Sequence, residues 1–139
     1  MNVAEHARPK DTTHTRNRIL YWAITLLLMV PGAGGGLIEV FTGGPASVAQ
    51  TLTMLGYPLY IMKILGFAKV LGGIAIVTGR SPRLKEWAYA GFAFDFLGAT
   101  ASHVLAGDAA HAPAPIAFFV VLMASYALWY KTAATRLPG

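Results

Sequence analysis

The sequence predicts an all-α integral membrane protein, a four-helix bundle with both its N- and C-termini in the cytoplasm. Of its 139 residues, 55% are hydrophobic and only 12% are charged, about half the charged fraction of an ordinary soluble domain. Apolar runs long enough to cross roughly 30 Å of hydrocarbon recur along the chain. Basic residues gather on alternate connections between these runs, as the positive-inside rule requires.

Composition also limits the function. The chain has no cysteine, which excludes disulfide bonds, thiolate metal sites and a dithiol redox relay within it. Its net charge of +5 does not indicate nucleic-acid binding, because the basic residues form no periodic face interleaved with aromatic side chains. We therefore expect the lipid bilayer, and no nucleic acid, among its partners. The oligomeric state is not predicted.

The N-terminal part is expected to hold a tail and a first span. Residues 1–18 are rich in charge and poor in apolar side chains, which predicts a disordered, basic, cytoplasmic tail. Residues 19–41 form the first apolar span, interrupted at Pro31 to Gly36, where we expect a kink or a short unwound stretch. A signal peptide beginning near Arg16 is the alternative. We favour the span because the apolar run resumes at Leu37 and further spans follow.

A short helix and a second span are predicted next. The helix begins near Pro45, with Val48, Leu52 and Leu55 on one face, and lies along the outer interface or over the mouth of the bundle. Residues 57–79 form the second span. Its glycines, Gly66 and Gly73, share one face and predict a close helix neighbour.

The third and fourth spans complete the membrane domain, which we assign to residues 19–131. Ser81 and Pro82 are preferred at the N-cap and first helical position, so a helix begins there and leads into a third span over residues 87–106. In it, Gly98 and Ser102 form a small-xxx-small pair that predicts close packing. Residues 107–112 form an outer loop, residues 116–130 the fourth span, and residues 132–139 a cytoplasmic tail.

Lysines and arginines predict the orientation. All eleven except Lys63 and Lys69 flank the spans on one side, whereas residues 42–56 and 107–112 contain none. The positive-inside rule therefore places both termini, and the connection between the second and third spans, in the cytoplasm.

Four ionisable side chains lie inside the second and third spans: Lys63, Lys69, Asp95 and His103. Such a group is unfavourable by roughly 2.5 kcal/mol or more at a helix centre, so it normally faces a partner or a water-lined cavity. At a rise of about 1.5 Å per residue, Lys69 and Asp95 lie at the same depth in neighbouring antiparallel helices. We predict an ion pair between them.

Lys63 and His103 share a second level, nearer the outer interface, where Glu39 of the first span also ends. The sequence thus predicts a polar column with Lys69 and Asp95 at its base and Lys63, His103 and Glu39 around its outer mouth, and these five are candidate ligand-binding residues. The alternatives are structural: the ion pair fixes helix register, Lys63 snorkels, Glu39 contacts water, and His103 is a satisfied or solvated imidazole. No metal site is expected, because no acidic or histidine pair has helical ligand spacing.

Several blocks of the sequence resemble the DoxX-like family of small bacterial membrane proteins from about residue 19 onward. They are Gly56, Tyr57 and Pro58; Lys63, Gly66 and Lys69; the run from Pro82 to Phe92; and Asp95, Gly98, Ala99, Ser102, His103, Gly107 and Asp108. The resemblance implies a multi-pass four-helix bundle in the bacterial cytoplasmic (inner) membrane.

Function is implied less directly. More distant DoxX and DoxD relatives are associated with thiosulfate:quinone oxidoreduction and with redox complexes. The resemblance therefore implies the membrane subunit of a redox system whose partner is a redox subunit. The expected ligand is a quinone or a small anion, and apart from a bound quinone no cofactor is expected in the chain. It assigns no catalytic residue. A non-enzymatic carrier of a small solute or protons, or a membrane scaffold, is the alternative.

Overall fold

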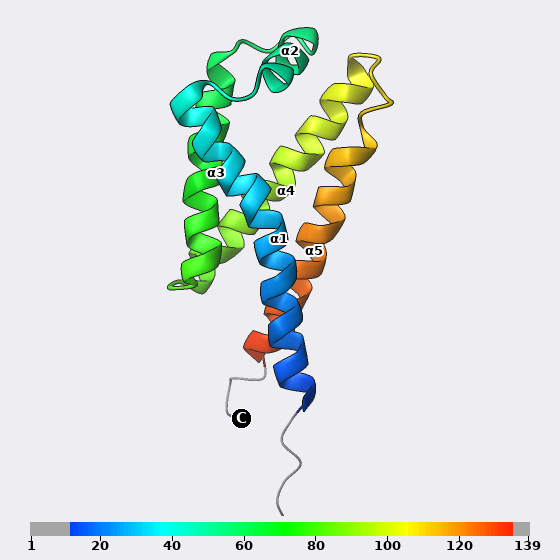
Figure 1. The fold of residues 1–139 in the computed structure, drawn as a ribbon. Coiled ribbons are helices and arrows are strands. Elements are labelled where there is room, and N and C mark those ends of the chain that lie inside the picture. The colour runs from blue at the N-terminus through cyan, green and yellow to red at the C-terminus, as the bar shows by residue number, and fades with distance from the viewer. Residues whose placement is uncertain (1–11, 135–139) are drawn as a thin grey trace, which may run out of the picture.

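The computed structural model describes residues 12–134, which form five α-helices and no strand. The helices are α1 (Thr12–Thr42), α2 (Ala46–Met54), α3 (Tyr60–Thr78), α4 (Pro82–Leu105) and α5 (Pro113–Ala134). The long helices α1 and α4 each pack against both α3 and α5. Figure 1 shows α2 and the α4–α5 connection at one end of the molecule, and the beginning of α1 and the end of α5 at the other.

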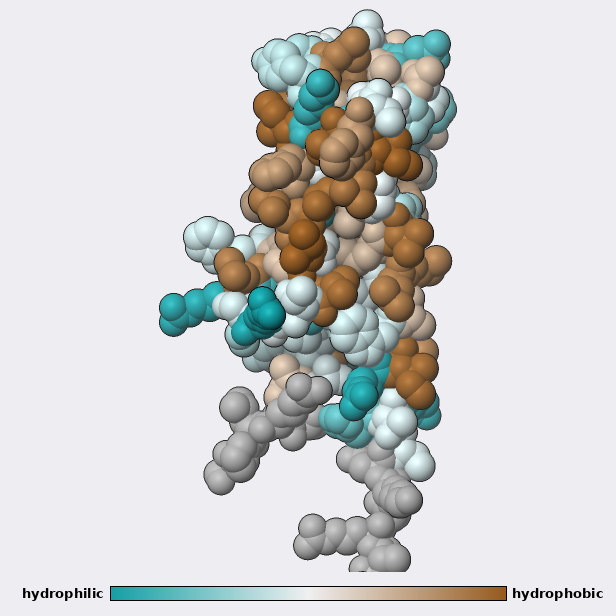
Figure 2. Space-filling view, turned by 60° about the vertical axis from the view of Figure 1, so that its left-hand side comes forward, coloured by the Kyte–Doolittle hydropathy of each residue, from teal (hydrophilic) through white to brown (hydrophobic). Residues whose placement is uncertain are grey.

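Three helices are long and apolar enough to cross a membrane: α1, α3 and Pro113–Ala133 of α5. Large apolar side chains also point outward along the molecule, with Val30 72% and Phe94 77% exposed. Figure 2 shows such side chains covering much of one face. A soluble protein rarely exposes this much contiguous apolar surface. The prediction of a helical membrane protein is therefore confirmed, whereas a fourth span along α4 and the orientation stay predictions.

The first helix begins earlier than predicted, and of the two alternatives predicted for its middle it shows the kink. It begins at Thr12, so residues 12–18, assigned to a disordered tail, are helical; residues 1–11 lie outside the described residues. It also continues through Pro31 to Thr42, so the glycine-rich stretch is not unwound. Figure 1 shows the axis of α1 changing direction near its middle, the usual effect of an internal proline. At the other terminus α5 extends through residues 132–134 of the predicted tail, and residues 135–139 are not described.

Several local predictions are confirmed. The short helix α2 follows Pro45 as its N-cap residue. The side chain of Ser81 caps α4, since its Oγ accepts a hydrogen bond from the backbone N–H of Leu84 at 3.4 Å. Gly79 ends α3 in the left-handed conformation, with φ 58°, which glycine adopts without a steric penalty.

Glycines set the distance between α1 and α3, as the sequence predicts. A Cβ atom on Gly66 would lie 2.7 Å from the carbonyl oxygen of Gly36, and one on Gly73 would lie 2.5 Å from the Cβ of Ala33. The prediction for Gly98 is wrong: a Cβ atom there would meet nothing within 4 Å. Gly98 therefore leaves space beside α4 and brings no helix close.

The buried core lies between α1, α3, α4 and α5, with Ile76 as the fully buried contribution of α3. Ser125 of α5 is fully buried, and its hydroxyl hydrogen-bonds those of Thr25 on α1 at 2.7 Å and Tyr89 on α4 at 2.8 Å. Near the predicted cytoplasmic end, the ammonium group of Lys85 lies 4.9 Å from the ring centre of Tyr21 and 5.1 Å from that of Trp129. Cation–π contacts thus let this basic residue pack inside the fold.

Candidate functional site

Three charged side chains from three helices meet beside the core. Nζ of Lys69 on α3 donates to Oε1 and Oε2 of Glu39 on α1, at 3.1 and 3.3 Å. Oδ2 of Asp95 on α4 lies 3.8 Å from the same nitrogen. All three side chains are largely buried, with exposures of 11% for Glu39, 19% for Asp95 and 20% for Lys69. We call these three residues the charged triad.

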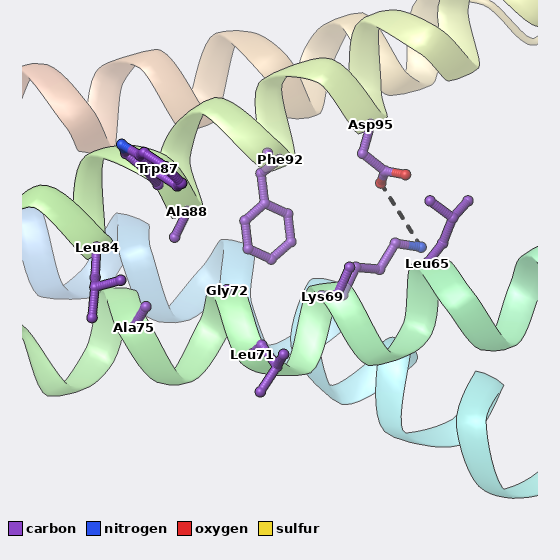
Figure 3. Close-up of a pocket in the computed structure, with 12 residues that line it drawn as sticks. Leu65, Lys69, Leu71, Gly72, Ala75, Leu84, Trp87, Ala88, Phe92 and Asp95 are labelled. Carbon is purple, nitrogen blue, oxygen red and sulfur yellow. Dashed lines mark ion pairs between the residues drawn. The ribbon is translucent and has the colours of Figure 1, made fainter.

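The triad corrects the predicted position of Glu39. The predicted pair between Lys69 and Asp95 is present, and Figure 3 shows the two side chains pointing toward each other from neighbouring helices. Glu39, however, pairs with Lys69 at the base of the column. This position corrects both its predicted place at the outer mouth and the alternative of a carboxylate in contact with water. Its shorter contacts make Glu39 the principal partner of the lysine.

Close helix packing explains why Glu39 reaches Lys69. Gly36 precedes Glu39 by one helical turn and Gly66 precedes Lys69 in the same way, so each glycine shares a face with its charged residue. A Cβ atom on Gly66 would lie 2.8 Å from the Cβ of Glu39, so only glycine admits this approach. The matching Gly-x-x-Glu and Gly-x-x-Lys patterns were the signal that the sequence analysis did not use.

A cavity of about 400 Å³ opens on one side of the triad, and we call it the polar cavity. Glu39, Lys69, Asp95 and His103 all line it. Its apolar wall includes Val48, Leu52 and Leu55, which are the predicted apolar face of α2. The hydroxyls of Tyr57 and Ser102 also line it and hydrogen-bond each other at 2.7 Å. The cavity therefore combines charged, hydroxyl and apolar groups.

Lys63 does not belong to this arrangement. Its side chain is exposed and is not among the residues that line the polar cavity. The predicted convergence of Lys63 with Glu39 and His103 is therefore wrong. The outward direction of Lys63 agrees with the alternative of a snorkelling lysine.

His103 has partners that the sequence analysis missed. Its Nδ1 lies 2.8 Å from Oδ2 of Asp108, and Nδ1 of His111 lies 2.6 Å from Oδ1 of the same carboxyl group. Hydrogen bonds from His111 and then from His103 lower the pKa of Asp108 below its ordinary value. The signal was the Gly-Asp sequence directly after the third span, which is typical of a helix C-terminus whose chain turns back.

An apolar groove lies on the other side of the triad, between α3 and α4. Its volume is about 350 Å³, and Leu65, Lys69 and Asp95 line both this groove and the polar cavity. Figure 3 shows Phe92 pointing from α4 toward Gly72 of α3. The ion pair between Lys69 and Asp95 thus borders the apolar groove on one side and, on the other, the polar cavity, whose apolar walls also carry charged and hydroxyl groups.

Within residues 12–134, no group of three histidine, aspartate or glutamate side chains is arranged to hold a metal ion. The cluster of His103, Asp108 and His111 instead uses the Nδ1 atoms of both rings to contact the carboxyl group.

One comparison with known proteins identifies a family. The model of the DoxX-like family matches residues 23–125, a range that contains the charged triad, the polar cavity and the histidine cluster. No curated protein matches the chain. No solved structure matches it either.

Proposed function

This chain belongs to the DoxX-like family, and we propose that it binds a quinone head group in the polar cavity as the membrane subunit of a redox system. One observation carries the proposal: a cavity of about 400 Å³ joins apolar walls to an ammonium group and an imidazole. Small-molecule sites commonly have this volume and combine mostly apolar walls with a few polar groups.

The chemistry of a quinone suits these walls. Its ring is flat and apolar, and its two carbonyl oxygens accept hydrogen bonds. Lys69 and His103 come from different helices; Lys69 donates as an ammonium group, and His103 donates from Nε2 when its ring is an imidazolium. Reduction to the quinol takes up two electrons and two protons; in the proposal a partner redox subunit supplies the electrons, and this chain binds the head group and exchanges the protons.

A small anion fits the cavity less well than the lysine alone would suggest. Lys69 already contacts the carboxyl groups of Glu39 and Asp95. With all three groups ionised, the triad carries a formal charge of −1, which repels an anion in a site of low dielectric. A neutral ligand with carbonyl oxygens avoids this repulsion.

We propose four membrane spans, including α4, with both termini cytoplasmic in the bacterial inner membrane. The distribution of lysine and arginine along the chain supports this orientation. The polar cavity, which α2 helps to line, then lies toward the outer side of the membrane, and the apolar groove lies toward the cytoplasm.

A carrier of protons or of a small solute is the second candidate function. It is favoured by the position of Lys69 and Asp95, which line the hollows on both sides of their ion pair. A charged pair between two hollows is the arrangement that a carrier would use to separate two sides of a membrane.

Native mass spectrometry of protein extracted together with its lipids separates the two functions. The quinone proposal predicts a retained quinone and saturable binding of added decylubiquinone to protein in nanodiscs. Proton-coupled uptake into liposomes, with neither retained quinone nor decylubiquinone binding, would contradict that proposal and support a carrier.

A further inference from the structure

We infer that His103, Asp108 and His111 form a proton-exchange site that connects the polar cavity with the solution beyond the α4–α5 loop. The inference rests on the proposed function in one respect only, the identification of a quinone as the proton donor or acceptor in the cavity. Proton movement between the cavity and the solution follows from the cluster itself.

The three groups lead from the cavity to the surface. His103 lines the polar cavity and its side chain is only 12% exposed, Asp108 is 21% exposed, and His111 is 73% exposed. The two carboxyl oxygens of Asp108 contact different rings, Oδ2 that of His103 and Oδ1 that of His111. One carboxyl group therefore bridges an imidazole in the cavity and an imidazole in water.

The end of α4 holds this geometry in place. Gly107 adopts φ 78°, its N–H donates to the carbonyl of Val104 at 3.2 Å, and the N–H of Asp108 donates to the carbonyl of His103 at 2.8 Å. These two bonds form a Schellman motif, which needs a residue such as glycine in the left-handed conformation. The backbone thus brings Asp108 back beside His103, and a bond of 3.1 Å from the N–H of His111 to the carbonyl of Asp108 fixes the second ring.

Because Nδ1 of His103 faces Asp108, Nε2 is the ring nitrogen left for a ligand in the cavity. A quinol hydroxyl can transfer its proton to this atom: the O–H bond breaks, the N–H bond forms, and the carboxyl group stabilises the resulting imidazolium. The reverse step protonates a reduced quinone oxygen. Neither step moves an electron, because the partner subunit carries the redox change.

Release to solution begins with Asp108 ionised and with His111 as the Nε2–H tautomer, which an exposed ring reaches by exchanging protons with water. The Nδ1 proton of the His103 imidazolium moves to the carboxylate, which becomes a carboxylic acid. Rotation of the carboxyl group turns this proton toward Nδ1 of His111, which accepts it while the Nε2 proton of His111 passes to water. Asp108 is a carboxylate before and after, so one proton enters at His103 and one leaves at His111.

Other titratable groups face His103 across the cavity. They are Tyr57, ahead of α3, and the charged triad of Glu39, Lys69 and Asp95. Tyr57 is already hydrogen-bonded to Ser102, and the triad residues are bonded or ion-paired to one another. In the described part of the chain, His103 lines the cavity and its side chain also contacts the exposed loop.

The test measures how fast ring N–H protons of His103 exchange with water, by nuclear magnetic resonance of histidine-labelled protein in nanodiscs. The chain has four histidines, and single variants assign their signals. We expect fast exchange in the unmodified protein and exchange slower by about tenfold or more in His111→Gln and in Asp108→Asn. Lys63→Gln, which changes an exposed cation outside the cavity, is the matched control and leaves the rate unchanged.

Tautomer-sensitive nitrogen shifts give a second reading on the same samples. Asp108→Glu keeps a carboxyl group and should keep His103 in the Nδ1–H form, whereas Asp108→Asn should lose that preference. Unchanged exchange in folded His111→Gln would overturn the inference, whether or not decylubiquinone binds. If decylubiquinone does not bind but the exchange rates are as expected, the quinone proposal is contradicted and the proton-exchange site is supported.

Discussion

Replacing Lys69 by methionine should destabilise the protein more than any other single change in the charged triad. The lysine is the only cation of the triad, and its side chain is 80% removed from solvent, with an exposure of 20%. Lys69→Met keeps the length and apolar stem of the side chain but leaves Glu39 and Asp95 facing each other without a positive charge.

The distances give the size of the effect. At an effective dielectric constant of about 20, the attraction of Lys69 is about 5 kcal/mol for Glu39 at 3.1 Å and about 4 kcal/mol for Asp95 at 3.8 Å. Desolvation opposes most of this attraction, and breaking a buried pair typically lowers stability by about 3 to 5 kcal/mol. Because all three groups keep some exposure to solvent, we expect Lys69→Met to lower stability by an amount at the lower end of this range, about 3 kcal/mol.

Compensating substitutions test whether the three residues act together. Lys69→Met with Asp95→Leu should recover little stability, because Glu39 remains as a buried, unpaired carboxylate. Adding Glu39→Gln to this double variant should recover most of the loss, because no buried ionised group then remains. Denaturation with sodium dodecyl sulfate and thermal melting in detergent measure both effects. Full recovery in the double variant would refute the coupling of Glu39 to Lys69.

Three further predictions concern the loop, the helix packing and the topology. Hydrogen bonds from His111 and His103 lower the pKa of Asp108 in the folded protein. Its carboxylate therefore stabilises the fold at pH values above the pKa of the unfolded chain, and this contribution is lost as the pH falls through the lowered pKa of the folded protein. Thermal melting between neutral pH and about pH 3 should show less acid sensitivity in Asp108→Asn. Gly66→Ala should lower stability by about 1 to 3 kcal/mol through overpacking, whereas Gly98→Ala, which meets open space, should not lower it. In intact cells an impermeant thiol reagent should label Ser47→Cys and not Arg80→Cys; the reverse pattern would contradict the proposed orientation.

Membrane character and several helix ends could be predicted because they follow from local patterns. Apolar length, the positions of basic residues and the preferences of Ser81 and Pro82 at a helix start need no knowledge of tertiary structure. The pair of Lys69 and Asp95 was also accessible, since a short connection makes two helices antiparallel and a constant rise per residue then matches their depths.

The position of Glu39 was not accessible by the same reasoning. The depth estimate counted residues from a first span that began at residue 19, but α1 begins at Thr12. The direction of a side chain around its helix also depends on which neighbour packs against it, and α1 approaches α3 through Gly36 and Gly66. Depth alone therefore placed Lys63 in the column although its side chain points outward.

The histidine cluster was missed for a different reason. Its members come from the last turn of α4 and from the following loop, and a loop conformation follows from specific backbone dihedral angles that hydropathy does not encode. Gly107 marks the turn, but the return of Asp108 to His103 depends on the two Schellman hydrogen bonds.

The central claim is that the polar cavity holds the ligand. The most direct test measures how much quinone is retained by variants in which one glycine is replaced by leucine. A Cβ atom would meet nothing within 4 Å at Gly98, Gly91 or Gly35, so each position should accept a side chain without disturbing helix packing. Gly98 lines the polar cavity, Gly91 lines the apolar groove, and Gly35 lines neither. In native mass spectrometry, Gly98→Leu should lose the retained quinone while Gly35→Leu keeps it. Retention in Gly98→Leu equal to that in Gly35→Leu, or loss in Gly91→Leu alone, would contradict the claim.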